Sequence, residues 1–129
     1  MQKIKIRLSS RQNGENFISE CEGAVEECGG ETKFVYPLNG DGCELTVRAD
    51  GSVTQTRRGS INIEMEFVRG EKTFCRISDG AFCGEFPVFC ESAEFAKDEK
   101  GYNLKLRYSQ NEINGDEGRT ALEFAAALK

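Results

Sequence analysis

Arg57 is the residue whose type and predicted position most favour a binding function. If Val53 faces inward, the two-residue period of a β-strand turns Gln55 and Arg57 inward as well. An inward arginine needs an anionic or carbonyl partner, because desolvation of an unpaired buried charge costs several kcal/mol. That partner is either an acid of the same chain, such as Glu85, or a carboxylate or phosphate on a ligand, unless the side chain reaches out beside the following turn.

Large inward side chains compete with a ligand for the space around Arg57. The same strand period turns several of them inward: Met65, Phe67, Tyr108 and Phe124. These residues favour a mostly filled interior, whereas Gln55 and Arg57 leave a polar patch that a ligand could use. We therefore predict Arg57, Gln55 and Tyr108 as ligand-binding residues.

Catalysis is disfavoured by the absence of histidine. The chain has no Ser-His-Asp or Cys-His pair, no histidine base and no imidazole ligand for a metal. The six cysteines lack the two-residue separation of thiolate metal sites and redox motifs, and we interpret them as small buried side chains. Asp41, in Asn39-Gly40-Asp41-Gly42, lacks the other ligands of a calcium loop and is interpreted as a turn residue. We predict no enzyme activity, catalytic residue, cofactor or metal.

Charge and hydropathy limit the partners and the location of the chain. Seventeen basic and 22 acidic side chains give a formal charge of -5, which is the wrong sign for binding phosphates. No apolar run approaches the ~20 residues of a membrane span. Residues 1–9 alternate charged and apolar side chains and lack the apolar core of a signal peptide. We expect a cytoplasmic protein with reduced thiols, no nucleic-acid partner and no membrane span; no oligomeric state follows from the sequence.

The elements that must position Arg57 are short strands separated by glycine turns. Nine turn-forming pairs divide the chain into about ten segments: Asn13-Gly14, Gly29-Gly30, Asn39-Gly40, Asp50-Gly51, Arg58-Gly59, Arg69-Gly70, Asp79-Gly80, Lys100-Gly101 and Asn114-Gly115. Segments between them alternate apolar and polar residues, most clearly 61–67. Segment 119–129 contains helix-favouring alanines but alternates too, and we predict a strand.

A sheet of so many strands can bury one face by folding into a sandwich or by closing into a barrel, and we favour the barrel. The predicted fold is all-β: a single antiparallel meander that closes into a barrel of about 8–10 strands, in one domain over residues 1–129. A three-residue connection at 58–60 would pair Arg57 with Ile61, with Gly59 in the left-handed conformation. Pro87 cannot donate to a ladder and therefore marks a bend, a bulge or an edge.

The second half of the chain resembles a known family. Arg57 with Gly59, Phe67 with Gly70, the segment 84–88 and the strand 104–108 match the spacing of the YwiB-like bacterial domains of unknown function. The sequence departs from that pattern at Cys90, where threonine is expected. The resemblance implies a calycin or lipocalin-like β-barrel and a bacterial, cytoplasmic setting, and it supplies no catalytic residues.

Two kinds of function agree with these patterns. A barrel of about eight strands is wide enough either to fill with side chains or to hold one small ligand. By analogy with calycins, we expect a non-enzymatic barrel that binds a small, anionic or amphipathic molecule in its lumen. The alternative is a structural or protein-interaction module with a lumen filled by its own side chains.

Overall fold

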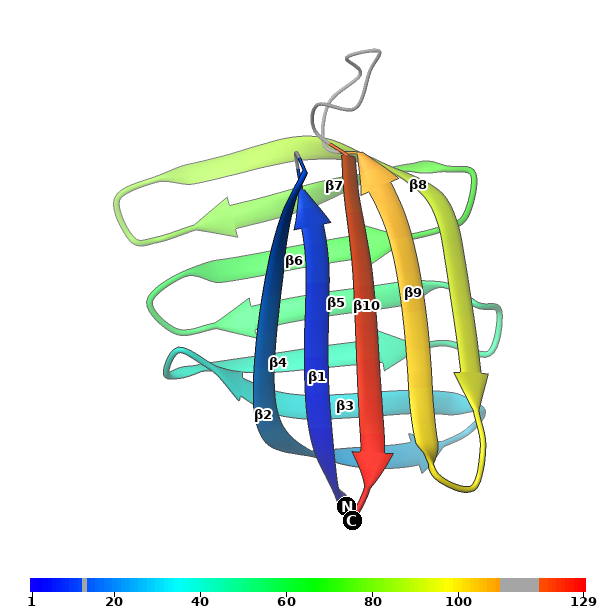
Figure 1. Ribbon diagram of the computed structural model, residues 1–129. Coiled ribbons are helices and arrows are strands. Elements are labelled where there is room, and N and C mark those ends of the chain that lie inside the picture. Colours follow the sequence, from blue (N-terminus) through cyan, green and yellow to red (C-terminus); the bar gives the residue numbers. More distant parts are fainter. Residues whose placement is uncertain (13, 110–118) are drawn as a thin grey trace.

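A computed structural model describes residues 1–12, 14–109 and 119–129, and these residues form one closed antiparallel barrel (Figure 1). Its strands are β1 (Gln2–Gln12), β2 (Glu15–Cys28), β3 (Glu31–Leu38), β4 (Asp41–Val47), β5 (Val53–Arg58), β6 (Asn62–Phe67), β7 (Lys72–Ser78), β8 (Cys83–Lys97), β9 (Gly101–Ser109) and β10 (Arg119–Leu128). Each strand pairs with the next, and β10 pairs with β1. The all-β meander, the closure into a barrel and the strand at the C-terminus are confirmed. The predicted turn at Asn114-Gly115 lies outside the described residues.

β2 changes partner along its length. It pairs with β1 from Glu15 to Val25 but with β3 only over Ala24–Cys28. Gly23 lies at this change: a Cβ there would be 2.5 Å from the carbonyl oxygen of Val35, so glycine lets the two backbones approach. In Figure 1, β2 descends beside β1 and then turns to run below the strands that cross behind.

β8 makes the second change of direction. It pairs first with β7 over Cys83–Phe89 and then with β9 over Phe89–Lys97, with a bulge between Cys90 and Ser92. Such a bulge bends a strand, and Figure 1 shows β8 turning downward from the rear layer into the front layer. Pro87 lies in the part of β8 that pairs with β7 alone among the described residues, so of the predicted bend, bulge or edge the structure shows an edge.

Large apolar side chains fill one end of the lumen. The Phe34 ring lies 4.8 Å from that of Phe124 and 5.2 Å from that of Tyr102, measured between ring centroids. Lys97 Nζ donates to Glu27 Oε1 at 2.8 Å nearby, on β8 and β2. We call this region around Phe34, Tyr102 and Phe124 the filled end. Over the barrel as a whole, the largest fully buried apolar side chains are Phe34, Phe67, Phe124, Ile4, Ile6, Leu45, Leu104, Leu106, Val53 and Val88. The predicted inward residues Met65, Phe67, Tyr108 and Phe124 are all buried, as expected.

Candidate functional site: the open end of the barrel

The opposite end of the lumen carries one row of inward-facing residues across six strands. Consecutive cross-strand partners from β3 to β8 form this row: Tyr36, Cys43, Arg57, Ile63, Ile77 and Gly84. The β3–β4, β5–β6 and β7–β8 turns beside it gather on the left of Figure 1. Phe86 follows on β8 with inward parity, yet it remains 41% exposed. An inward side chain that remains exposed means that solvent reaches the lumen here, and we call this region the open end.

Arg57 is paired with an acid of its own chain. Its Nε donates to Asp41 Oδ2 at 2.7 Å, and the two side chains are 20% and 5% exposed, respectively. Asp41 begins β4, two residues before Cys43, the cross-strand partner of Arg57. The inward position predicted for Arg57 is thus confirmed. Of the partners that the sequence left open, the structure shows an acid of the same chain, and this acid is Asp41, which the sequence indicates only as a turn residue.

The β5–β6 turn wraps around the Asp41 carboxylate. The Ser60 backbone N–H donates to Asp41 Oδ1 at 2.9 Å, and the Ser60 hydroxyl lies 3.2 Å from both carboxylate oxygens. A Cβ at Gly59 would lie 2.0 Å from Oδ1, so only glycine leaves room for the carboxylate. The Ser60 N–H and the Arg57 guanidinium hold the pKa of Asp41 below its usual value. The spacing of Arg57 and Gly59 therefore reflects a carboxylate clamp.

Two details of the predicted pairing are wrong. Arg57 lies opposite Ile63 instead of Ile61, because the turn that encloses Asp41 extends to residue 61. This register shift of two residues preserves the inward parity of both strands. Glu85 faces outward, since its neighbour Gly84 faces inward, and it pairs with Arg76 on the barrel exterior.

The guanidinium of Arg57 retains donors that the clamp does not use. Only its Nε is bonded to a described residue, which leaves Nη1 and Nη2 for solvent or a ligand. Gln55, on the same face of β5, lies near Tyr36, and burial raises the pKa of Tyr36. Tyr108 lies elsewhere: its ring packs 4.8 Å from that of Phe67, and burial raises its pKa. Of the three predicted ligand-binding residues, the structure groups Arg57 and Gln55 on one strand and places Tyr108 in the core.

Apolar side chains form the other half of the open end. Ile63 and Ile77 continue the row from Arg57, and both are only half-buried. Gly84 provides no side chain, and the Phe82 ring occupies that space, 2.9 Å from where a Cβ would be. Phe82 is itself more than half exposed. The open end thus combines a guanidinium at one side with an exposed apolar wall at the other.

The comparisons with known proteins agree with this barrel. A family model described as "Domain of unknown function (DUF1934)" matches residues 3–123. The chain belongs to this family. The DUF1934 chain is also similar in structure to the ywiB protein from Bacillus subtilis, with a TM-score of 0.67 and 15% sequence identity over 99% of this chain and 92% of that one. The resemblance that the sequence suggested is therefore confirmed for family and fold. No curated protein matches the chain.

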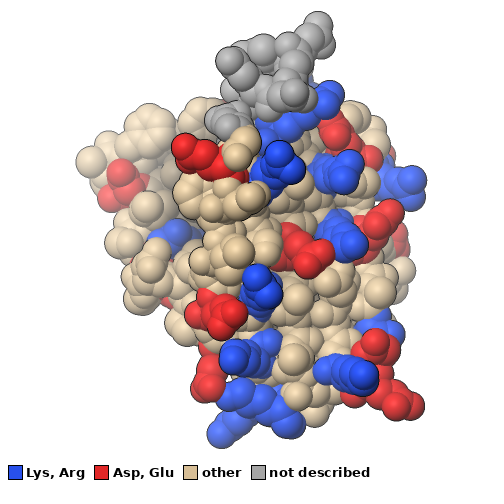
Figure 2. All heavy atoms as spheres, viewed as in Figure 1, with Lys and Arg blue, Asp and Glu red and all other residues tan. Residues whose placement is uncertain are grey.

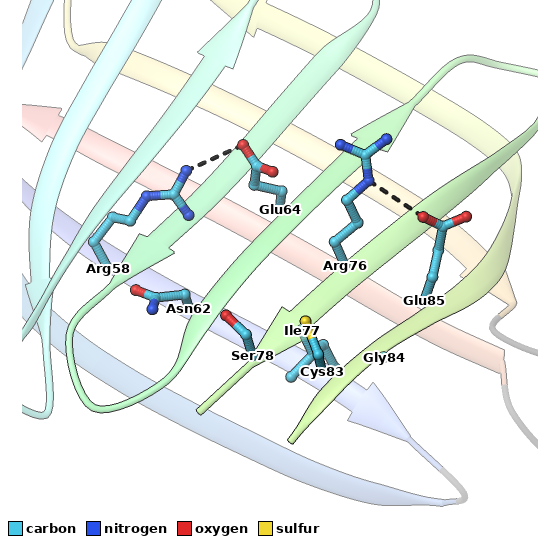
Figure 3. A pocket seen from close by; sticks show the side chains of 9 residues that line it. All are labelled: Arg58, Asn62, Glu64, Arg76, Ile77, Ser78, Cys83, Gly84 and Glu85. Carbon is cyan, nitrogen blue, oxygen red and sulfur yellow. Dashed lines mark hydrogen bonds and ion pairs between the residues drawn. The ribbon is translucent and has the colours of Figure 1, made fainter. Parts of the chain in front are cut away.

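A hollow of this DUF1934 chain lies on the outer side of β5–β8 (Figure 3). It measures roughly 430 Å³, and its charged residues are already paired. Arg58 bonds to Glu64 at 3.1 Å, and Arg76 bonds to Glu85 at 3.3 Å. These two pairs form an alternating row of charges across four strands. Because each arginine already has a carboxylate partner, we interpret this row as cross-strand pairing that supports the sheet and needs no ligand.

The rest of the exterior has no single dominant charge in the view of Figure 2, where acidic and basic side chains are interspersed over β1, β2, β9 and β10. The described residues contain no helix long and apolar enough to cross a membrane.

The six free thiols divide equally between the core and more accessible positions. Cys43, Cys75 and Cys90 are buried, as the sequence interpretation expects. Cys28 and Cys83 are exposed, which corrects that interpretation for these two positions. Cys21 is half-buried on the inner side of β2, opposite the buried Ile6 of β1, and burial raises its pKa.

Proposed function

We propose that the open end of the barrel binds a small amphipathic molecule without chemical conversion. The observation that supports this proposal is an inward apolar wall left in contact with solvent beside a partly unsatisfied guanidinium. The apolar part of the ligand would cover Ile63, Ile77 and Phe86, and its polar head would accept hydrogen bonds from Nη1 and Nη2 of Arg57. Pockets with this combination of apolar walls and a few oriented polar groups are typical of small-molecule sites.

The Asp41 carboxylate restricts the head group. It neutralises the Arg57 charge at 2.7 Å, so a dianionic phosphate would bring a second negative charge against an already compensated site. A single carboxylate or a neutral carbonyl needs only the two free nitrogen donors, which a planar acceptor can engage together. We therefore propose a monocarboxylate or carbonyl head group attached to an apolar body.

Decanoate is a direct probe of this site, and its binding can be measured by isothermal titration calorimetry. The Phe86→Asp variant should weaken decanoate binding at least tenfold, because it removes apolar contact and adds repulsion. Phe74→Asp is the matched control: Phe74 is 52% exposed on the outer face of the same hairpin, opposite Pro87. The affinity of the Phe74→Asp variant for decanoate should equal that of the unchanged protein. Absence of decanoate binding, or equal loss in both variants, would contradict the proposal.

The filled end favours one alternative function, a structural or protein-interaction module. Much of the lumen is occupied by the protein's own side chains, and Arg57 already has an internal partner. Native mass spectrometry of the protein purified from its own host separates the two functions. A retained small molecule supports ligand binding, whereas a bound protein without a small molecule supports the alternative.

A further inference from the structure

The first half of β2 has one unpaired backbone edge among the described residues. From Glu15 to Gly23 this strand pairs with β1 on one side, and its ladder with β3 begins only at Ala24. Figure 1 shows this part of β2 running in front of the strands that cross behind the barrel. The free edge therefore offers a row of N–H and C=O groups that could pair with another strand.

The edge of β2 differs from the comparable edge of β8. The part of β8 that pairs with β7 alone contains Pro87, which removes a donor and thus discourages strand addition. Residues 15–23 of β2 contain no proline, lysine or arginine, and no bulge interrupts their pairing with β1. Two of them, Phe17 and Ile18, are apolar and more than half exposed. These are features of an edge that accepts a strand.

Charge indicates which strand would fit. The outer face of β2 presents Glu20 and Glu22, which lie opposite Arg7 and Lys5 of β1. Glu22 is also ion-paired with Lys129, so Glu20 is the acid on which the charge argument rests. On the exterior of β5–β8, charge alternates from strand to strand as Arg58, Glu64, Arg76 and Glu85. The corresponding alternation from β1 to β2 ends on an acidic strand at the free edge. A further strand placed there would continue the alternation if its outward side chains were basic.

We propose that an extended peptide segment with alternating apolar and basic residues adds to the edge of β2 at Glu15–Gly23. Its backbone would pair with the free N–H and C=O groups, in the strand-addition mode of peptide recognition. Its basic side chains would lie beside Glu20, and its apolar side chains would face inward beside Phe17. This interaction depends on β2 and does not require the small-molecule site at Arg57.

A capped octapeptide of alternating valine and lysine tests this surface by fluorescence anisotropy. N-methylation of every second peptide amide on the pairing side should abolish binding, because it removes the backbone donors. A valine–glutamate octapeptide should bind at least tenfold more weakly. Glu20→Lys should reduce affinity for the valine–lysine peptide about tenfold. The matched control Glu44→Lys, on β4 with paired neighbours on both sides, should leave that affinity unchanged.

Amide hydrogen exchange identifies the edge directly. Binding of the peptide should slow exchange at alternate amides of residues 15–23 and leave the amides of β4 unaffected. Equal binding of the N-methylated peptide, or equal effects of Glu20→Lys and Glu44→Lys, would overturn the proposal. Protection of these amides without peptide that disappears on dilution would assign the edge to a second copy of the chain and would overturn it too. The decanoate titration compares variants at Phe86 of β8 and Phe74 of β7, outside β2, so the two proposals can fail separately.

Discussion

The two ends of this barrel are built from the same strands, yet they differ in what covers their inward side chains. At the filled end, rings from β3, β9 and β10 pack against one another, and those of Phe34 and Phe124 are fully buried. At the open end, β2 has lost its pairing with β3, and the inward residues Phe17 and Phe86 remain exposed. The difference shows that strand number alone does not decide whether a small barrel has an accessible lumen. In this barrel, accessibility depends on the change of partner along the long strand β2.

Removing an aromatic ring should be far more destabilising at the filled end than at the open end. Phe34→Ala removes a fully buried side chain and should reduce the free energy of unfolding by about 3–5 kcal/mol. Phe86→Ala truncates a ring that is 41% exposed and should cost less than about 1 kcal/mol. Urea denaturation measures both. Similar losses for the two variants would contradict the division of the lumen into two ends.

Loss of the carboxylate clamp should have an intermediate effect. Asp41→Ala leaves the Arg57 guanidinium and the Ser60 N–H without their acceptor, so we expect a clear drop in the urea midpoint, smaller than that of Phe34→Ala. Arg57→Met combined with Asp41→Asn should recover part of the loss, because no unpaired charge remains. A midpoint unchanged by Asp41→Ala would show that the turn does not depend on the clamp.

The clamp also predicts an acid-dependent loss of stability. Since the pKa of Asp41 is lower in the folded protein than in the unfolded chain, its contribution is complete above the unfolded value, near pH 4. The contribution is then lost as pH falls through the folded value. The midpoint temperature of thermal unfolding should therefore fall more steeply below about pH 4 in the unchanged protein than in Asp41→Asn. Parallel curves of midpoint temperature against pH for the two proteins would contradict a lowered pKa of Asp41 in the folded protein.

The exterior charge row should contribute least. Glu85→Gln removes one exposed partner of Arg76, and its effect on the free energy of unfolding should stay within about 0.5 kcal/mol. Urea denaturation at low and high salt provides the check. A loss as large as that of Asp41→Ala would mean that Glu85 supports the fold as strongly as the inward acid does.

Strand pattern predicted much of this barrel, because period two and glycine turns are local properties. The inward parity of Arg57 followed from Val53, and it survived a register error of two residues, since such a shift keeps every side chain on its face. The partner of Arg57 could not be found locally. Asp41 lies 16 residues away and resembles an ordinary turn residue until the β5–β6 turn encloses its carboxylate. The open end was not predicted from the sequence either, because it depends on how little of β2 pairs with β3.

Thiol labelling of the folded protein tests the contrast between the two ends most directly. Cys21 faces inward on the unpaired part of β2, whereas Cys43, Cys75 and Cys90 are buried. Maleimide labelling followed by peptide mass spectrometry should modify Cys28 and Cys83 first, then Cys21, and leave the three buried thiols unmodified. Decanoate should slow the labelling of Cys21 alone. A Cys21 that is as protected as Cys90, or that reacts at the same rate with and without decanoate, would contradict an accessible, ligand-binding open end.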